Sequence, residues 1–104
     1  MHIHFERTGG FANIRLQTEI DSAQLPAREA RTLNRLIEEA HLFDQPTKAT
    51  AAGDQPDQFQ YEITISDAGR ARTIQTSDAA ASDEMRELID WLTRAARQGL
   101  GGKA

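Results

Sequence analysis

The sequence contains no cysteine, few aromatic residues and no long apolar run. Without cysteine the chain forms no disulfide and no thiolate metal site, and it has no thiol nucleophile. No apolar run approaches the roughly 20 residues that a membrane-spanning helix needs, and the N-terminus lacks a basic segment followed by an apolar one. These absences argue against redox chemistry, and we expect a cytoplasmic protein without a membrane partner.

Basic residues are too few for a general nucleic-acid binder. The chain has 12 Lys and Arg against 16 Asp and Glu, giving a formal net charge of -4. Phosphate binding depends on clustered basic side chains, and Arg70 and Arg72 do not reverse this balance. The 104 residues, 38% of them hydrophobic, fit one domain with a modest core. We expect that domain over residues 1–98, followed by a flexible tail over residues 99–104.

A glycine pair, Gly9-Gly10, separates two segments in which apolar and polar residues alternate. This pattern predicts a β-hairpin with strands over residues 2–8 and 11–20 and the two glycines as its loop. Phe5 then lies opposite Ile14, and the large apolar side chains share one face. The sequence therefore predicts a sheet that is buried on one side.

The polar face of this hairpin carries His2 and His4, which project from one side of a strand as two metal ligands would. The predicted register places them opposite Gln17 and Arg15 in a solvated ladder. No third ligand accompanies them at a recognisable spacing, whereas zinc takes three or four protein ligands. We therefore predict neither a metal site nor a cofactor.

Two segments are candidates for recognition. Phe11 falls on the polar face beside the predicted turn, opposite Thr8, so its ring is either a contact group or a partly covered side chain at a plain turn. Residues 44–58 form a predicted loop of small and polar residues. This loop is longer than most connections between secondary-structure elements, which have roughly 4–6 residues. Such loops are functional or simply mobile, and this one carries Asp54 and Asp57.

Two amphipathic helices are predicted, the first beginning at Pro26 and the second capped by Ser82 and ending at Gly99. The flank of the second stripe carries Trp91, which we expect at the edge of the core. The apolar stripes comprise Ala30, Leu33, Leu36, Ile37 and Ala40 in the first helix and Met85, Leu88, Ile89, Leu92 and Ala96 in the second.

A second hairpin lies between the helices. Residues 59–66 alternate strictly, and a turn at Ala68-Gly69 sets Ile63 against Ile74. The element order β-β-α-β-β-α predicts an α+β two-layer sandwich, in which a four-stranded, largely antiparallel sheet carries both helices on one face. The sequence leaves the order of the strands open.

No catalytic constellation is recognisable, because neither a nucleophile with a base, nor a carboxylate dyad, nor an open metal site can be assembled from the pattern. The adjacent pairs Glu38-Glu39 and Asp83-Glu84 point in different directions on helices. His41 suits the negative end of a helix dipole. We predict that the protein is not an enzyme.

The chain contains four short motifs, namely Phe5-Glu6-Arg7-Thr8-Gly9-Gly10-Phe11-Ala12, Leu33-x-x-Leu36-Ile37 leading to Leu42-Phe43, Pro56-Asp57-Gln58-Phe59-Gln60-Tyr61, and Leu88-Ile89. Over about residues 2–97, these motifs resemble the emfourin family. Emfourins are small bacterial inhibitors of thermolysin-like metalloproteases, protealysin among them, so the resemblance implies a non-enzymatic protein that occludes the cleft of such a protease.

The resemblance assigns no inhibitory residue, so we place the contacts on the two candidate segments. Phe11 would fill an apolar pocket of the cleft, and a carboxylate of the long loop would approach the zinc directly or through water. An interface of roughly 1,600 Å² needs both segments. We expect a monomer when free; the alternative is an interaction module with another partner. The predicted partner-binding residues are Arg7, Thr8, Gly9, Gly10, Phe11, Asp54 and Asp57.

Overall fold

The computed structural model describes residues 1–9, 15–45, 59–78 and 80–98. These residues form four strands and two α-helices in the predicted order, with two short 3-10 helices in addition. The elements are β1 (His2–Gly9), β2 (Leu16–Asp21), η1 (Ser22–Gln24), α1 (Ala27–Ala40), η2 (Leu42–Asp44), β3 (Phe59–Asp67), β4 (Arg70–Ser77) and α2 (Asp83–Gln98).

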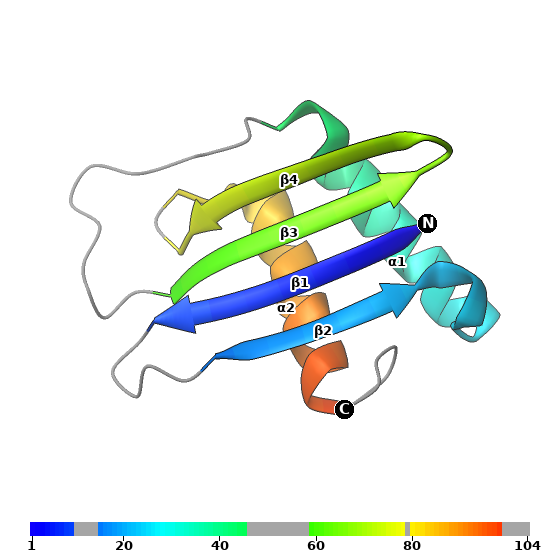
Figure 1. Ribbon diagram of the computed structural model, residues 1–104, viewed down its shortest axis with the longest axis horizontal. Helices are drawn as coiled ribbons and strands as arrows, with labels where there is room; N and C mark the ends of the chain where they lie inside the picture. Colours follow the sequence, from blue (N-terminus) through cyan, green and yellow to red (C-terminus); the bar gives the residue numbers. More distant parts are fainter. Residues whose placement is uncertain (10–14, 46–58, 79, 99–104) are drawn as a thin grey trace.

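The four strands form one antiparallel sheet in the order β2-β1-β3-β4. Both helices lie on the same face of this sheet (Figure 1). The predicted α+β two-layer sandwich is therefore confirmed, and the strand order that the sequence left open is now defined. Because β1 pairs with β3, the N-terminal strand lies in the middle of the sheet and joins the two hairpins.

The predicted register of the first hairpin is wrong. Phe5 lies opposite Thr18, four residues beyond Ile14, and the β1–β2 pairs end at Arg7 and Leu16. An even shift leaves every side chain on its original face, so the alternating pattern cannot distinguish the two registers. The two-residue loop is also wrong, because β1 continues to Gly9, where it still pairs with β3.

The predicted register of the second hairpin is confirmed, with Ile63 opposite Ile74 and Thr64 opposite Thr73. The two turn residues, Ala68 and Gly69, have φ angles of 52° and 82°. Positive φ at both central positions is typical of the tight turn whose twist matches that of the flanking strands. For an alanine this left-handed conformation is strained, because its Cβ approaches the following carbonyl.

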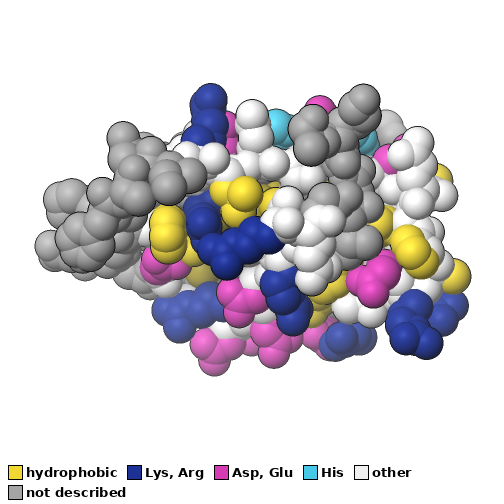
Figure 2. Space-filling model, turned by 90° about the horizontal axis from the view of Figure 1, so that it is seen from below, with side chains coloured by type: hydrophobic (Ala, Val, Ile, Leu, Met, Phe, Trp, Pro, Cys, Tyr) yellow, Lys and Arg dark blue, Asp and Glu magenta, His cyan; other side chains and the backbone are white. Residues whose placement is uncertain are grey.

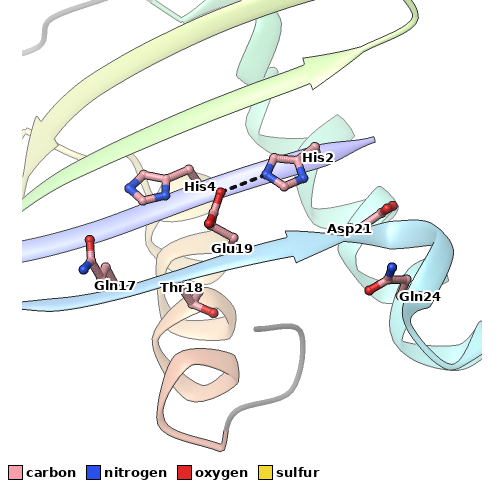
Figure 3. Close-up of a pocket in the computed structure, with 7 residues that line it drawn as sticks. All are labelled: His2, His4, Gln17, Thr18, Glu19, Asp21 and Gln24. Atoms are coloured by element: carbon pink, nitrogen blue, oxygen red, sulfur yellow. Dashed lines mark hydrogen bonds and ion pairs between the residues drawn. The ribbon is translucent and has the colours of Figure 1, made fainter. Parts of the chain in front are cut away.

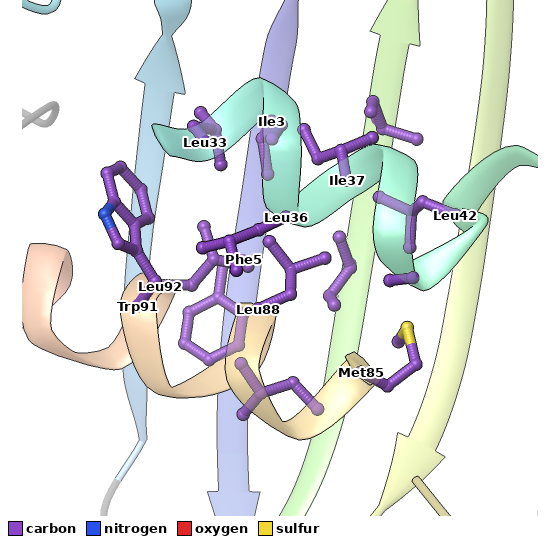
Figure 4. Close-up of a cluster of buried hydrophobic side chains, with 14 of the residues drawn as sticks. Ile3, Phe5, Leu33, Leu36, Ile37, Leu42, Met85, Leu88, Trp91 and Leu92 are labelled. Carbon is purple, nitrogen blue, oxygen red and sulfur yellow. The ribbon is translucent and has the colours of Figure 1, made fainter. Parts of the chain in front are cut away.

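The core lies between the sheet and the two helices (Figure 4). The predicted stripes are largely confirmed, although Ala30 is only partly buried and Ala95 takes the fully buried position that we assigned to Ala96. Trp91 is 6% exposed and belongs to the core, as expected. The largest side chains exposed by less than 2% are Phe5, Ile3, Ile20, Leu33, Leu42, Ile63, Ile65, Ile74, Leu88 and Leu92.

The helix ends follow the expected chemistry with one displacement. The hydroxyl oxygen of Ser82 accepts a hydrogen bond from the backbone N–H of Met85 at 3.2 Å, which confirms the predicted cap. Pro26 is the residue before the first turn of α1 rather than within it. His41 ends α1 in the left-handed conformation, with φ 51°. Neither of the two α-helices described is long and apolar enough to span a membrane.

Candidate functional site

The structure brings the flanks of both predicted contact segments to the same end of the sheet. Gly9 precedes residues 10–14, Phe59 follows residues 46–58, and these two flanking residues pair directly in the β1–β3 ladder. Figure 1 shows this end of the sheet opposite the β3–β4 turn. We call it the loop end, and it comprises Arg7, Thr8, Gly9, Phe59, Tyr61 and Asp78.

Three of the predicted contact residues belong to the loop end. Arg7, Thr8 and Gly9 are partly buried residues at the end of β1. Gly10, Phe11, Asp54 and Asp57 lie outside the described residues, so their proposed roles stay predictions.

An aromatic row leads from the core to the surface at the loop end. The rings of Phe5 and Tyr61 are stacked, with centroids 6.2 Å apart and planes 19° apart. The next ring along β3, that of Phe59, lies 6.5 Å from Tyr61, and the guanidinium carbon of Arg7 lies 4.2 Å above the centroid of Phe59. Sequence reasoning missed this row, although two aromatic residues at alternate positions of one strand indicate a shared face.

Asp78 links the elements of the loop end through hydrogen bonds. Its carboxylate accepts hydrogen bonds from the hydroxyl of Tyr61 at 2.5 Å and from the backbone N–H of Phe59 at 3.1 Å. The backbone N–H of Asp78 donates to the carbonyl of Phe59, and the guanidinium of Arg86 on α2 donates to the carbonyl of Asp78 at 3.0 Å. These bonds tie the start of β3 to the end of β4 and to α2. No local sequence signal indicates this role, because the partners are far apart in the chain.

The hydroxyl of Tyr61 remains protonated far above neutral pH. Burial raises the pKa of Tyr61, and the hydrogen bond to Asp78 and the negative charge of Asp78 raise it further. The positive charge of Arg7 lowers the same pKa, and Asp90 on α2 raises it. Tyr61 therefore acts as a fixed hydrogen-bond donor rather than as a titrating group.

The outer face of the sheet carries a shallow polar hollow of about 390 Å³ beside β1 and β2 (Figure 3). His2 Nε2 lies 3.2 Å from Glu19 Oε1, and Figure 3 shows Glu19 between the two histidines. Arg15 pairs with Glu6 at 2.7 Å and not with His4, which corrects the predicted ladder. Across residues 1–9, 15–45, 59–78 and 80–98, no group of three or more His, Asp or Glu is placed to hold a metal ion.

The exposed faces of the helices carry charges of both signs. The lower part of the space-filling view shows Lys and Arg side chains interspersed with Asp and Glu (Figure 2). On α1, the guanidinium of Arg35 lies 3.5 Å from Glu39 one turn later. Such mixed, solvated surfaces give little specific recognition. The loop end, with its rings and its partly buried arginine, differs from them in both composition and packing.

Comparison with known proteins identifies the family of the chain. The model of the emfourin family matches residues 5–93, a span that includes the described part of the loop end. Among solved structures, emfourin (M4in) from Serratia proteamaculans, described as an M4 family peptidase inhibitor, matches with 22% identity and a TM-score of 0.47. This match covers 89% of the present chain and 87% of the Serratia chain. No curated protein matches the chain significantly. Because the family model matches well over half of its residues, the chain belongs to the emfourin family.

Proposed function

We propose that this protein inhibits a thermolysin-like metalloprotease, of the M4 family to which protealysin-type enzymes belong. Family membership supports the inhibitor role, and the Serratia relative is described as an M4 family peptidase inhibitor. Membership of this family also agrees with the prediction from the sequence that the chain is not an enzyme. We further propose that the inhibitor acts as a monomer in the cytoplasm.

The loop end is the surface that we propose to cover the active-site cleft of the protease. The observation that carries this proposal is the pairing of Gly9 with Phe59, which sets the two predicted contact segments side by side at their bases. The sheet and the bonds of Asp78 hold these bases rigidly. Binding groups on loops that a rigid scaffold positions are a common arrangement in recognition proteins.

The size of a stable interface also favours two segments. A specific protein complex buries roughly 1,600 Å² in total, which is more than one loop tip supplies. In the proposed complex, Phe11 occupies an apolar pocket of the cleft. Asp54 or Asp57 approaches the catalytic zinc, either as a ligand or through a water molecule.

A titration of thermolysin with this protein tests the proposal. We expect peptidase activity to fall progressively as inhibitor is added, while mass spectrometry shows the inhibitor intact. A serine protease such as subtilisin, assayed in parallel, should keep its activity. Undiminished thermolysin activity, or cleavage of the added protein in step with apparent inhibition, would contradict the proposal.

A further inference from the structure

Arg7 is a partly buried arginine with one unsatisfied side-chain donor. It follows Ile3 and Phe5 on the inward face of β1, and its guanidinium rests on the ring of Phe59 at 4.2 Å. The Nε atom of Arg7 is buried and has no hydrogen-bond partner. Among the described residues, the side chain of Arg7 has neither a hydrogen-bond partner nor an ion-pair partner. Burying a charged donor without an acceptor destabilises a fold, so this arrangement requires an explanation.

The carboxylates near Arg7 do not supply the missing acceptor. Both oxygens of Asp78 accept bonds from elsewhere, one from the hydroxyl of Tyr61 and the other from the N–H of Phe59. Asp90, on the exposed side of α2, influences Tyr61 electrostatically but forms no ion pair with Arg7. Neither Asp78 nor Asp90 therefore pairs with the guanidinium of Arg7.

Arg72, which is also partly buried, shows how this fold supplies an acceptor to an arginine. Its Nε donates to the carbonyl oxygen of Gln45 at 2.9 Å, and its terminal nitrogen donates to the same oxygen. Arg7 has the ring contact but no such acceptor. Within the described ranges, therefore, no residue supplies Arg7 with the kind of acceptor that Gln45 gives to Arg72.

We infer that Arg7 receives a carboxylate of the protease partner. This inference rests on the proposed function and specifies the partner's chemistry at the loop end. The planar guanidinium offers donors in a fork that matches two carboxylate oxygens, and stacking on Phe59 holds that fork in place before binding. Arginine is enriched among the residues that dominate binding energy in protein interfaces.

The variant Arg7→Met separates binding from folding. Methionine keeps the apolar contact with Phe59 but removes the unpartnered donor, so we expect a thermal midpoint equal to or above that of the wild type. The inhibition constant for thermolysin should rise about tenfold to a hundredfold, the range for a lost hydrogen bond to a charged group. Arg70→Met is the matched control, because Arg70 stacks on Phe43 at the opposite end of the sheet, and it should leave inhibition unchanged.

Arg7→Glu tests the charge of the ligand. If a carboxylate faces Arg7, the reversal should weaken inhibition more than Arg7→Met does, and the difference should shrink at high salt. Equal inhibition by wild type and Arg7→Met, or equal weakening by the Met and Glu variants, would overturn the inference. Unfolding or a lower thermal midpoint of Arg7→Met would also overturn it, since the residue would then be structural. Failure of the wild type itself to inhibit would instead count against the proposed function.

Discussion

The two ends of the sheet carry the same contact in opposite settings. At the end of the sheet that carries the β3–β4 turn, residues 66–71, which we call the turn end, Arg70 lies 4.1 Å above the ring of Phe43. At the loop end, Arg7 lies 4.2 Å above the ring of Phe59. Arg70 is exposed and follows a tight two-residue turn. Arg7 is partly buried and has no acceptor for its Nε atom.

The two contacts differ in the access of solvent to the arginine donors, because Arg70 is exposed whereas the Nε atom of Arg7 is buried. The donors of an exposed arginine bind solvent, so the cation–π contact at the turn end adds stability at little cost. The buried Nε of Arg7 has lost its solvent and gained nothing in exchange within the described part of the chain. The turn end is complete in the free protein, whereas the loop end is suited to gain bonds on binding.

The largest expected effect on stability comes from removing the carboxylate of Asp78, which links the strands at the loop end. Asp78→Ala removes the acceptor of the Tyr61 hydroxyl and of the Phe59 N–H. We expect a loss of about 2–3 kcal/mol in the free energy of unfolding, measured by urea denaturation. Asp67→Ala is the control at the turn end, where the carboxylate is 43% exposed and lies 3.9 Å from the N-terminal amine. It should cost less than about 0.5 kcal/mol; equal costs would break the comparison.

Phe11→Ala should weaken the inhibition of thermolysin by at least about tenfold, because a side chain in an interface pocket contributes strongly to binding. Circular dichroism should show an unchanged fold. Phe43→Ala provides the matched phenylalanine at the turn end, where the ring packs against the core. That variant should lower stability and leave the inhibition constant of the folded protein unaltered. Unchanged inhibition by Phe11→Ala would remove this residue from the contact.

Alkaline pH should lower the stability of the folded protein because of the buried hydroxyl of Tyr61 at the loop end. The pKa of Tyr61 is raised in the folded protein by burial and by Asp78, so the protonated form is favoured on folding. Its contribution to stability is complete below the unfolded pKa of about 10 and is lost as the pH rises toward the folded pKa. We therefore expect Tyr61 to contribute to a loss of stability between pH 9 and pH 11.

Urea denaturation of the wild type and of Tyr61→Phe at pH 9 and pH 11 measures this contribution. The wild type should lose more stability than the variant over this interval. An identical pH dependence of the two proteins would contradict the assignment of the titrating group.

The smallest expected effect is a gain in stability at the turn end. Ala68 has a φ of 52°, a conformation that asparagine adopts more readily than alanine and that Asn-Gly turns favour. Ala68→Asn should therefore raise the free energy of unfolding by about 0.5–1 kcal/mol. Thermal denaturation measures the gain, and inhibition should not change. A lower midpoint would show that the turn is not strained.

The sequence predicts those features that depend on local spacing. The 3.6-residue repeat placed Leu33 and Leu88 in the core, and the short Ala68-Gly69 turn fixed the register between Ile63 and Ile74. A two-residue turn permits few alternatives, which is why the second hairpin could be predicted in detail.

Features that depend on distant residues could not be predicted in this way. The alternating pattern of β1 and β2 is the same in registers that differ by an even number of residues, so Phe5 was paired with Ile14 instead of Thr18. The bonds between Asp78 and Phe59 join the ends of a hairpin, and the stacking of Arg7 on Phe59 depends on the β1–β3 pairing. Sequence reasoning selected Arg7 as a contact residue but gave no reason for its chemistry.

Hydrogen exchange of this protein, free and bound to a catalytically inactive thermolysin, tests the central claim most directly. We expect slower exchange in the complex for peptides covering residues 5–16 and 46–61, which contain or adjoin the loop end. Exchange of the turn end, residues 66–71, should be the same in both states. Protection confined to the turn end or to the outer helix surfaces would contradict the proposed binding of the protease through the loop end.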